Sequence, residues 1–463
     1  MSPQPPQQPA RPQRSYPDRP PRDPAEPQPA KVTPARRVAF EILTLVGGGK
    51  GHSDELLHST RTAALSPEDR NLTTAIVMGV LRWQIALDAQ IAALLSRPDQ
   101  RVPAPVSIVL RMGAFQLLHL DRIPAHAALS ESVELCRIAG QPQAAGMVNA
   151  VLRKLSVSKP PKTPIFESIP ALATRLSHPE WLVNRWVAAY GQSAARAICA
   201  YDQQIPAAGG LFPPPDQPED AGSTPPGDPL PQMDDGSRLV AELAAAAAPH
   251  TGQPTRVWDC CAAPGGKTRI LAARLPYADI LASDVSSQRL QQMEARLRAA
   301  PGTSRVRTAV LDAAAGPPAP QPAAEPAFDL ILCDVPCSGT GTLARNPEIR
   351  LRLRPEELPR QAQRQRAILT HALRRLAPGG RLLYSTCSLE AEENEAVVLH
   401  AKDAGGYRTL PIEPLLQSLA GQGLLSPAAS DLLCRSAVRN GTLRTLPGTH
   451  PCDGFFAVIF ERE

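Results

Sequence analysis

Apolar residues recur with helical spacing through the N-terminal part of the chain. Those of residues 38–46 fall on one face of a helix. Ser66-Pro67-Glu68-Asp69 is a typical helix start, with a proline in the first turn. Further helices are expected over residues 106–120 and 124–140. Because no strand pattern interrupts this spacing, residues 34–156 predict a compact all-α domain.

The pattern changes after residue 234, where short apolar runs alternate with helical stretches such as 287–299 and 358–376. This alternation is typical of α/β folds. It predicts a Rossmann-like, doubly wound domain over residues 232–463, built on a parallel sheet. Its strands are expected at 256–259, 279–284, 306–312, 328–334, 381–386 and 455–460.

Two segments follow neither pattern. Residues 1–33 are rich in proline, glutamine and arginine, a composition typical of disordered tails. Residues 157–231 contain one expected helix, around 181–199, followed by nine prolines between positions 206 and 231. We expect this second segment to be a helical and proline-rich linker.

Composition excludes several classes of protein. The chain has 463 residues, a net charge of +5 and no apolar run of the roughly 18 residues that a membrane span needs. Its first 30 residues hold 11 prolines and no stretch typical of a signal peptide, which predicts a cytoplasmic protein. The nine cysteines include no C-x-x-C pair, so neither a disulfide framework nor a metal site is expected. No obligate protein partner is evident.

Four of the six expected strands end in an aspartate: Asp259, Asp284, Asp312 and Asp334. In open α/β sheets the ligand lies beyond the carboxyl ends of the strands. The four carboxylates therefore indicate a ligand rich in hydroxyl groups, amines or positive charge.

The first strand leads into a glycine-rich turn, in which backbone can approach a ligand closely. The Gly-Lys-Thr at its end is not a complete phosphate-binding loop, because that motif needs glycine where this chain has Cys261. Asp284, 19 residues after Gly265, has the spacing of an acid that binds ribose hydroxyls. Asp312 is placed to contact the amino group of a base. A nucleoside without phosphates, such as S-adenosylmethionine, fits this pattern.

Two cysteines are expected at the same edge of the sheet. The strand at 328–334 runs into a turn that carries Asp334 and Cys337, and the strand at 381–386 delivers Cys387. A lone cysteine at a strand end is usually structural, but a pair beside a nucleoside site indicates covalent chemistry. A thiolate added to carbon 6 of cytosine makes carbon 5 nucleophilic enough to accept a methyl group. A carboxyl group near ring nitrogen 3 would stabilise the developing charge. The spacing alone does not choose which cysteine attacks.

These stretches resemble, in order, the motifs of the Sun/RsmB family of RNA 5-methylcytosine methyltransferases. The most specific are Asp334-Val335-Pro336-Cys337-Ser338, Ser385-Thr386-Cys387-Ser388 and Glu392-Glu393-Asn394-Glu395. The N-terminal part is similar to the NusB-like RNA-binding domain of that family, at residues 68–83, 111–118, 124–128 and 148–153.

The resemblance implies that Cys387 attacks the base, that Cys337 assists product release, and that Asp334 binds the target base. It implies small-subunit (16S) ribosomal RNA as the substrate and S-adenosylmethionine as the cofactor. The residues that it assigns to the cofactor are Cys261, Ala262, Ala263, Pro264, Gly265, Gly266, Lys267, Asp284, Asp312 and Asp334. The chain departs from the family in residues 201–231, which lack the strands of a small α/β subdomain that relatives usually carry.

An arginine-rich segment joins the two cysteine motifs. Residues 345–381 contain ten arginines and three glutamates, a net charge of +7 that exceeds the charge of the whole chain. We expect phosphate contacts from Arg345, Arg350 and Arg352, and a target cytosine turned out of its stack.

Three other functions fit part of the sequence. One is methylation of tRNA cytosines by the same chemistry. A second is a non-catalytic RNA-binding factor in ribosome assembly, against which the intact cysteine pair argues. A third is a nucleotide hydrolase built on Gly-Lys-Thr, which Cys261 disfavours.

Overall fold

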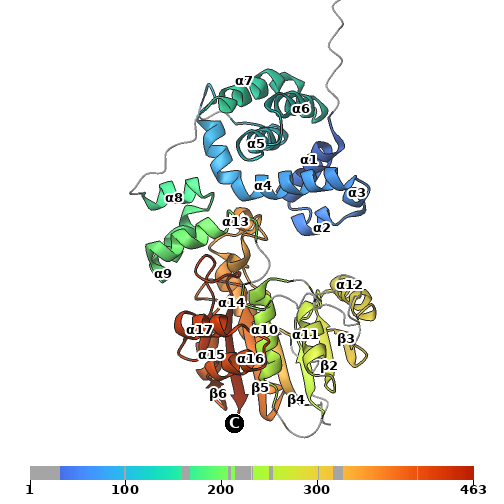
Figure 1. Ribbon diagram of the computed structural model, residues 1–463, viewed down its shortest axis with the longest axis vertical. Helices are drawn as coiled ribbons and strands as arrows, with labels where there is room; N and C mark the ends of the chain where they lie inside the picture. Colours follow the sequence, from blue (N-terminus) through green and yellow to red (C-terminus); the bar gives the residue numbers. More distant parts are fainter. Residues whose placement is uncertain are drawn as a thin grey trace, which may run out of the picture.

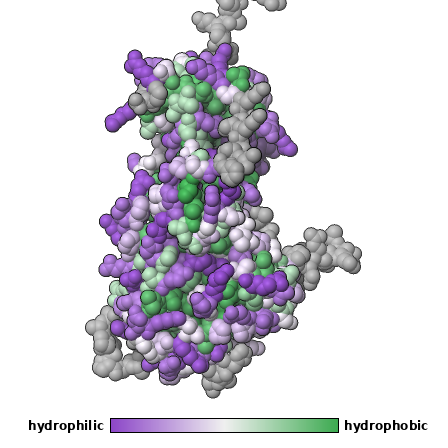
Figure 2. Space-filling view, turned by 90° about the vertical axis from the view of Figure 1, so that its left-hand side faces the viewer, coloured by the Kyte–Doolittle hydropathy of each residue, from purple (hydrophilic) through white to green (hydrophobic). Residues whose placement is uncertain are grey.

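The computed structural model describes residues 32–97, 101–158, 167–206, 210–213, 231, 233–249, 254–300, 302–315, 327–403 and 405–463. Residues 1–31 of the tail expected at 1–33 and most of the proline-rich stretch after residue 206 lie outside the described residues. An all-α domain and an α/β domain are stacked along the long axis (Figure 1). Between them lie α8 (Ile169–Arg175), α9 (Glu180–Tyr201) and α13 (Ile349–Arg352). On the face shown in Figure 2, hydrophobic areas are small and separated by hydrophilic residues.

The N-terminal domain is all-α, as the spacing of its apolar residues predicts. Its helices are α1 (Pro34–Gly47), α2 (Ser53–Leu57), α3 (Thr60–Ala63), α4 (Pro67–Ala92), α5 (Ala104–His119), α6 (Ala125–Ile138) and α7 (Ala145–Ser156). Helix α5 is central and packs against α1, α4, α6 and α7. Gly79 of α4 permits this packing, because a Cβ there would lie 1.9 Å from the Phe115 ring. The Ser66 side chain caps α4 by accepting a hydrogen bond from the Asp69 N–H.

Helix α4 is also the described helix that is long and apolar enough to cross a membrane, judged by length and composition. Half of its apolar window is buried. Ile76, Val77 and Leu87 are fully buried in the core of the N-terminal domain. The apolar character of α4 is therefore explained by its packing.

The stretch expected as a linker contains two helices, α8 (Ile169–Arg175) and α9 (Glu180–Tyr201). Trp186 and Ile198 of α9 share a buried cluster with Leu343 and Leu389 of the α/β domain. Helix α9 is therefore packed on that domain along part of its length.

The C-terminal domain has one mixed sheet in the order β3-β2-β1-β4-β5-β9-β8-β7, with β6 also paired to β9. The strands are β1 (Arg256–Asp259), β2 (Asp279–Asp284), β3 (Val306–Val310), β4 (Phe328–Asp334), β5 (Leu376–Thr386), β6 (Tyr407–Leu410), β7 (Val438–Arg439), β8 (Thr442–Arg444) and β9 (Phe456–Arg462). Strands β1 to β5 are parallel, as predicted. The expectation of a wholly parallel sheet is wrong, because β9 runs antiparallel to β5.

Helices cover both faces of this sheet, which confirms the doubly wound, Rossmann-like fold. The helices α10 (Asp235–Ala246), α16 (Glu413–Gly421) and α17 (Pro427–Ser436) pack in one core cluster, and α14 (Glu357–Arg374) and α15 (Glu395–Asp403) in another. The remaining helices are α11 (Gly266–Arg274), α12 (Ser287–Arg298) and α13 (Ile349–Arg352). Residues 330–333 of β4 are a continuous apolar run, as expected for a strand that is buried on both faces.

The two domains meet at a buried arginine. Arg350 of α13 is only 1% exposed. Its Nη1 donates to the carbonyls of Ser177 (3.1 Å) and Arg82 (3.4 Å). Its Nη2 donates to those of Leu343 (3.2 Å) and Asp202 (3.4 Å). Burial lowers the pKa of Arg350 to about 10, so the guanidinium is charged at neutral pH. The expected phosphate contact of Arg350 is therefore wrong, since the side chain is buried and both Nη groups donate to backbone carbonyls.

Two neighbours of Arg350 in the arginine-rich segment bind the N-terminal domain directly. Arg352 Nη2 donates to the carbonyls of Val46 (2.9 Å) and Gly51 (2.8 Å). Glu348 accepts hydrogen bonds from the N–H (3.1 Å) and the hydroxyl (2.8 Å) of Ser53. The charged side chains of Glu348, Arg350 and Arg352 thus form hydrogen bonds within the domain interface.

We expect Arg350→Met to lower the free energy of unfolding by about 2–4 kcal/mol, because it leaves several buried carbonyls without a donor. The exposed Arg354→Met is the matched control and should change stability by less than about 0.5 kcal/mol. Urea unfolding followed by circular dichroism measures both. An Arg350→Met variant of normal stability but weakened RNA binding would contradict the buried role.

Candidate active site

Two thiols meet where β4 and β5 end. These strands pair in parallel with Asp334 opposite Ser385, so the turns that follow them leave the sheet at the same edge. The Sγ atoms of Cys337 and Cys387 lie 3.3 Å apart. The Gly341 N–H donates to the Cys387 carbonyl (2.9 Å) and ties the two turns together. The predicted convergence of the two cysteines is therefore confirmed.

The environment of Cys337 favours its protonated form. A hydrogen bond with Cys387 is the main cause that raises the pKa of Cys337 well above its usual value. Burial and the negative charges of Cys387 and Glu393 raise this pKa further. Cys337 is thus a thiol in the free protein.

A partly buried ion pair lies beside the sulfurs. Lys267 Nζ is 2.7 Å from Asp334 Oδ2 and also donates to the Ser237 hydroxyl (2.7 Å). The other oxygen of Asp334 accepts a hydrogen bond from the Ser385 hydroxyl (2.8 Å). Burial lowers the pKa of Lys267, but the charge of Asp334 and, to a smaller extent, that of Cys387 outweigh it and raise the pKa. A lysine cation therefore stands close to both a carboxylate and Cys387.

The glycine-rich turn between β1 and α11 is shaped by its backbone. Gly265 has a φ of 98°, and a Cβ there would approach Met293 Cγ to 2.8 Å, so glycine is required. Asp284 holds the turn from the neighbouring strand by accepting from the Ala263 N–H (3.3 Å). Asp259 is 1% exposed, accepts from the Thr268 hydroxyl (2.7 Å), and has its pKa raised by burial to about 7. Asp259 therefore stabilises the start of α11, directly after the glycine-rich turn, through its hydrogen bond with Thr268.

A cavity of about 670 Å³ joins the turn to the sulfurs. Its volume falls within the roughly 300–1,000 Å³ of small-molecule sites. One end is formed by Asp284 and Asp312 together with Val285 and Leu311, two apolar side chains that are 50% and 38% exposed. The other end reaches both cysteines, Asp334 and Lys267. Paired acids for ribose and amine groups, apolar walls for a base, and an acid near the thiols fit an adenosyl group with a sulfonium.

Sequence reasoning missed the two apolar walls of this cavity. They directly follow Asp284 and directly precede Asp312, so the aspartates at the strand ends were the available signal. Asp312 itself lies two residues beyond β3, in an exposed turn where it accepts from the Ala314 N–H (2.9 Å). Among the described residues, no group of three or more His, Cys, Asp or Glu side chains could hold a metal ion.

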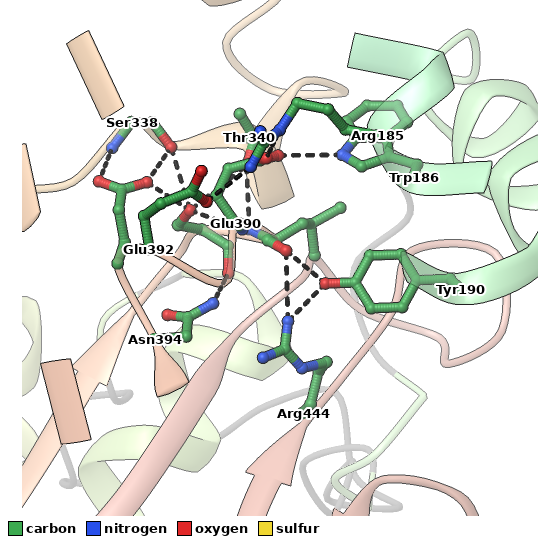
Figure 3. A network of polar contacts seen from close by, with 12 residues as sticks. Arg185, Trp186, Tyr190, Ser338, Thr340, Glu390, Glu392, Asn394 and Arg444 are labelled. Atoms are coloured by element: carbon green, nitrogen blue, oxygen red, sulfur yellow. Dashed lines mark hydrogen bonds and ion pairs between the residues drawn. The ribbon is translucent and has the colours of Figure 1, made fainter. Parts of the chain in front are cut away.

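Helix α9 clamps the segment that follows Cys387. Arg185 binds Glu390 and Glu392 at 2.6 Å each, and Trp186 Nε1 donates to Glu390 (3.1 Å). Tyr190 donates to the Leu389 carbonyl. Figure 3 shows these side chains reaching from α9 to the segment. Sequence analysis missed this clamp, since nothing in the pattern of the linker indicates its partner.

Arg345 lines the cavity but is committed to two carboxylates. Its Nε lies 3.0 Å from Asp453 and its Nη2 lies 3.0 Å from Asp234. Burial, followed by the charge of Asp234, raises the pKa of Asp453 to about 8. By contrast, Arg360 and Arg364 of α14 are exposed and have no ion-pair partner in the described part of the chain, and Arg364 lines the cavity.

The fold and the site define the class: a Rossmann-like methyltransferase domain behind a NusB-like helical domain. A family model described as 16S rRNA methyltransferase RsmB/F matches residues 244–461, and one described as NusB family matches residues 33–157. The probable ribosomal RNA small subunit methyltransferase B of Bacillus subtilis (strain 168) is 31% identical over 464 residues, which cover 92% of this chain and 98% of that protein.

A second relative agrees with the first. Ribosomal RNA small subunit methyltransferase B of Xanthomonas campestris pv. campestris is 32% identical over 447 residues, which cover 87% of this chain and 92% of that protein. The crystal structure of PH0851 has the same fold, with a TM-score of 0.67 and 21% identity over 94% of this chain and all of that one. The chain therefore belongs to the RsmB/F family of 16S rRNA methyltransferases and is an S-adenosylmethionine-dependent RNA methyltransferase.

Proposed function

We propose that this protein methylates carbon 5 of a cytosine in small-subunit ribosomal RNA, through a covalent bond between Cys387 and carbon 6 of the base. The observation that carries the proposal is the 3.3 Å approach of two thiols beside a partly buried lysine–aspartate pair. A structural role needs neither a second thiol nor a charged pair at the end of an open cavity. The printed names of the relatives support the small-subunit rRNA substrate.

The neighbours of the two cysteines support Cys387 as the nucleophile. A thiolate is the attacking form of cysteine. The charge of Cys387 is one of the causes that raise the pKa of Lys267, so this cation lies near Cys387 at the end of the cavity. Cys337 instead faces the negative charge of Glu393 and stays protonated.

The proposed reaction proceeds through a covalent adduct between Cys387 and the base. The Cys387 thiolate adds to carbon 6, and the electron pair of the 5,6 double bond becomes available at carbon 5. Asp334 lies where it can accept a hydrogen bond from the exocyclic amine of the base, and the Lys267 cation paired with it can stabilise the negative charge that develops in the ring. Carbon 5 then accepts a methyl group, which bound S-adenosylmethionine would supply, leaving its sulfur as the neutral thioether of S-adenosylhomocysteine. A base then removes the carbon 5 proton, the double bond re-forms, and the carbon–sulfur bond breaks to release the Cys387 thiolate.

Cys337 is suited to the removal of that proton. The hydrogen bond with Cys387 and the charge of Cys387 raise its pKa in the free protein. Both are lost once the Cys387 sulfur is bonded to carbon 6. Cys337 then releases its proton to solvent more readily, and its thiolate accepts the proton from carbon 5. The two thiols thus act in sequence.

The cofactor contacts that we propose follow the cavity. The turn from Cys261 to Lys267 holds the methionyl part, and Asp284 accepts hydrogen bonds from the ribose hydroxyls. Asp312 contacts the amino group of the adenine, and Val285 and Leu311 lie against its ring.

The RNA contacts that we propose lie on α14. Arg360 and Arg364 are one helical turn apart and exposed, and Arg364 lies at the cavity. Exposed arginines attract phosphates by releasing the counterions that surround RNA. We place no phosphate on Arg345, which already binds two carboxylates, or on Arg352, which holds the N-terminal domain.

We expect Cys387→Ala to abolish transfer of labelled methyl groups to RNA, because carbon 5 is then never activated. Cys337→Ala should form the adduct but not resolve it, so protein becomes trapped on RNA in denaturing gels. Methyl transfer is measured with labelled S-adenosylmethionine and rRNA or tRNA. Normal methylation by Cys387→Ala would contradict the mechanism. Label on tRNA alone would contradict the substrate, and RNA binding without any label would support the assembly-factor function.

We expect the double substitution Arg360→Gln, Arg364→Gln to weaken RNA binding and to reduce the slope of log affinity against log salt by roughly 2. Arg374→Gln, an exposed arginine at the other end of α14, is the matched control and should leave the slope unchanged. Fluorescence anisotropy over a salt series measures both. Equal slopes for the two variants would show that α14 does not contact phosphates.

A further inference from the structure

The residues that directly follow the two catalytic cysteines meet at one buried carboxylate. Ser338 follows Cys337, Ser388 follows Cys387, and their hydroxyl oxygens lie 3.0 Å apart. Glu393, which is 0% exposed, accepts hydrogen bonds from both of them. We propose that Glu393 is a positioning residue that holds the two sulfurs at their working distance by binding the serine beside each cysteine. The proposal rests on the catalytic roles assigned to Cys337 and Cys387 above.

The two oxygens of Glu393 divide the contacts between them. Oε1 accepts from the Ser338 N–H (2.8 Å) and from Gln365 Nε2 (2.9 Å). Oε2 accepts from the hydroxyls of Ser338 and Ser388, the latter at 2.5 Å. Every contact is a donor to the carboxylate, so both oxygens are used and the side chain has one orientation. No ion pair to Glu393 occurs in the described part of the chain, which leaves its charge uncompensated by a cation.

The backbone around Glu393 is fixed as well. Its carbonyl accepts from the Tyr384 hydroxyl (2.7 Å) of β5. The adjacent Asn394 donates to the Ser388 carbonyl (2.9 Å) and accepts from the Thr386 hydroxyl (2.6 Å). Figure 3 shows Asn394 with its hydrogen bond to a backbone carbonyl, which is that of Ser388. The carboxylate is therefore a fixed point to which both cysteine turns are attached.

Glu393 also makes the two cysteines unequal. The titratable groups that face Cys337 are Cys387 at the end of β5, Tyr384 within β5, and Glu393. Helix α14 contributes the neutral Gln365, which bridges the Pro336 carbonyl (3.0 Å) and Glu393. Because Cys387 is consumed when the adduct forms, Glu393 is the negative neighbour that continues to act on Cys337 during proton removal. It keeps Cys337 a stronger base at that step.

The substitution Glu393→Gln removes the negative charge of the side chain and keeps its size. The amide oxygen can still accept from the two N–H donors, and the amide nitrogen can donate to the two serine hydroxyl oxygens. We expect kcat to fall at least ten-fold with the KM for S-adenosylmethionine unchanged. We also expect the acid limb of the kcat profile to move to lower pH, because Cys337 ionises more easily without the charge. The matched control is Glu356→Gln, an exposed glutamate whose side chain makes no capping hydrogen bond at the start of α14, and which should behave as wild type.

A second readout needs no RNA. In a Cys387→Ala background, the pH dependence of Cys337 alkylation by iodoacetamide is followed by peptide mass spectrometry. Glu393→Gln should raise the alkylation rate at a fixed pH below the pKa at least ten-fold. Ser388→Ala keeps the charge and removes one contact, so it should lower kcat several-fold without moving the pH profile.

Wild-type kcat in both Glu393→Gln and Ser388→Ala would overturn the proposal. An unchanged alkylation profile in Glu393→Gln would overturn the electrostatic part. If wild-type protein made no carbon 5 methyl group at all, the proposed function would fail, while the alkylation result would still report on Glu393 itself.

Discussion

The parallel pairing of β4 with β5 is the constraint on which the site depends. Each strand is followed by a turn that carries a cysteine, and the register that places Asp334 opposite Ser385 brings both turns out at one edge. A shift of one residue would turn each side chain to the other face of the sheet. The register is secured by β9, which pairs with β5 along Arg381–Thr386 and buries the sheet interior. The 3.3 Å between the sulfurs is thus a consequence of strand geometry.

A second constraint joins the N-terminal domain to the same region. The segment between the two cysteine motifs enters the domain interface, where Arg350, Arg352 and Glu348 bind backbone and side-chain groups of the helical part. Helix α9 holds the segment after Cys387 from another side. The helical domain and the turns that carry the two cysteines are therefore mechanically connected, and an RNA bound by both would be presented to the cavity in a fixed orientation.

Local patterns predicted much of this structure. The helical spacing of the N-terminal domain, the strand–helix alternation and the serine cap of α4 are short-range signals, and the structure confirms them. The sequence also predicted that Cys337 and Cys387 meet, because each follows an expected strand and both strands end at the same edge of the sheet. The short strands β6, β7 and β8 were missed, since two to four residues carry too little periodicity.

The errors concern long-range partners. A count of arginines gave a basic segment but not its exposure. Arg350 lies buried against four carbonyls, three of which come from distant parts of the chain. The sequence placed Glu393 in a family motif but indicated no role for it. Its serine partners follow cysteines that are 50 residues apart in sequence, so their meeting at Glu393 is visible only in the fold. The antiparallel direction of β9 likewise depends on a chain path that composition does not encode.

Which sulfur bonds to the pyrimidine can be read directly on the wild-type protein. RNA containing 5-fluorocytosine, incubated with the protein and S-adenosylmethionine, holds the adduct because fluorine cannot leave carbon 5 as a proton does. Protease digestion and mass spectrometry then identify the cross-linked peptide. We predict the peptide that contains Cys387. A cross-link through Cys337, or methylation of this RNA with no cross-link at all, would contradict the mechanism.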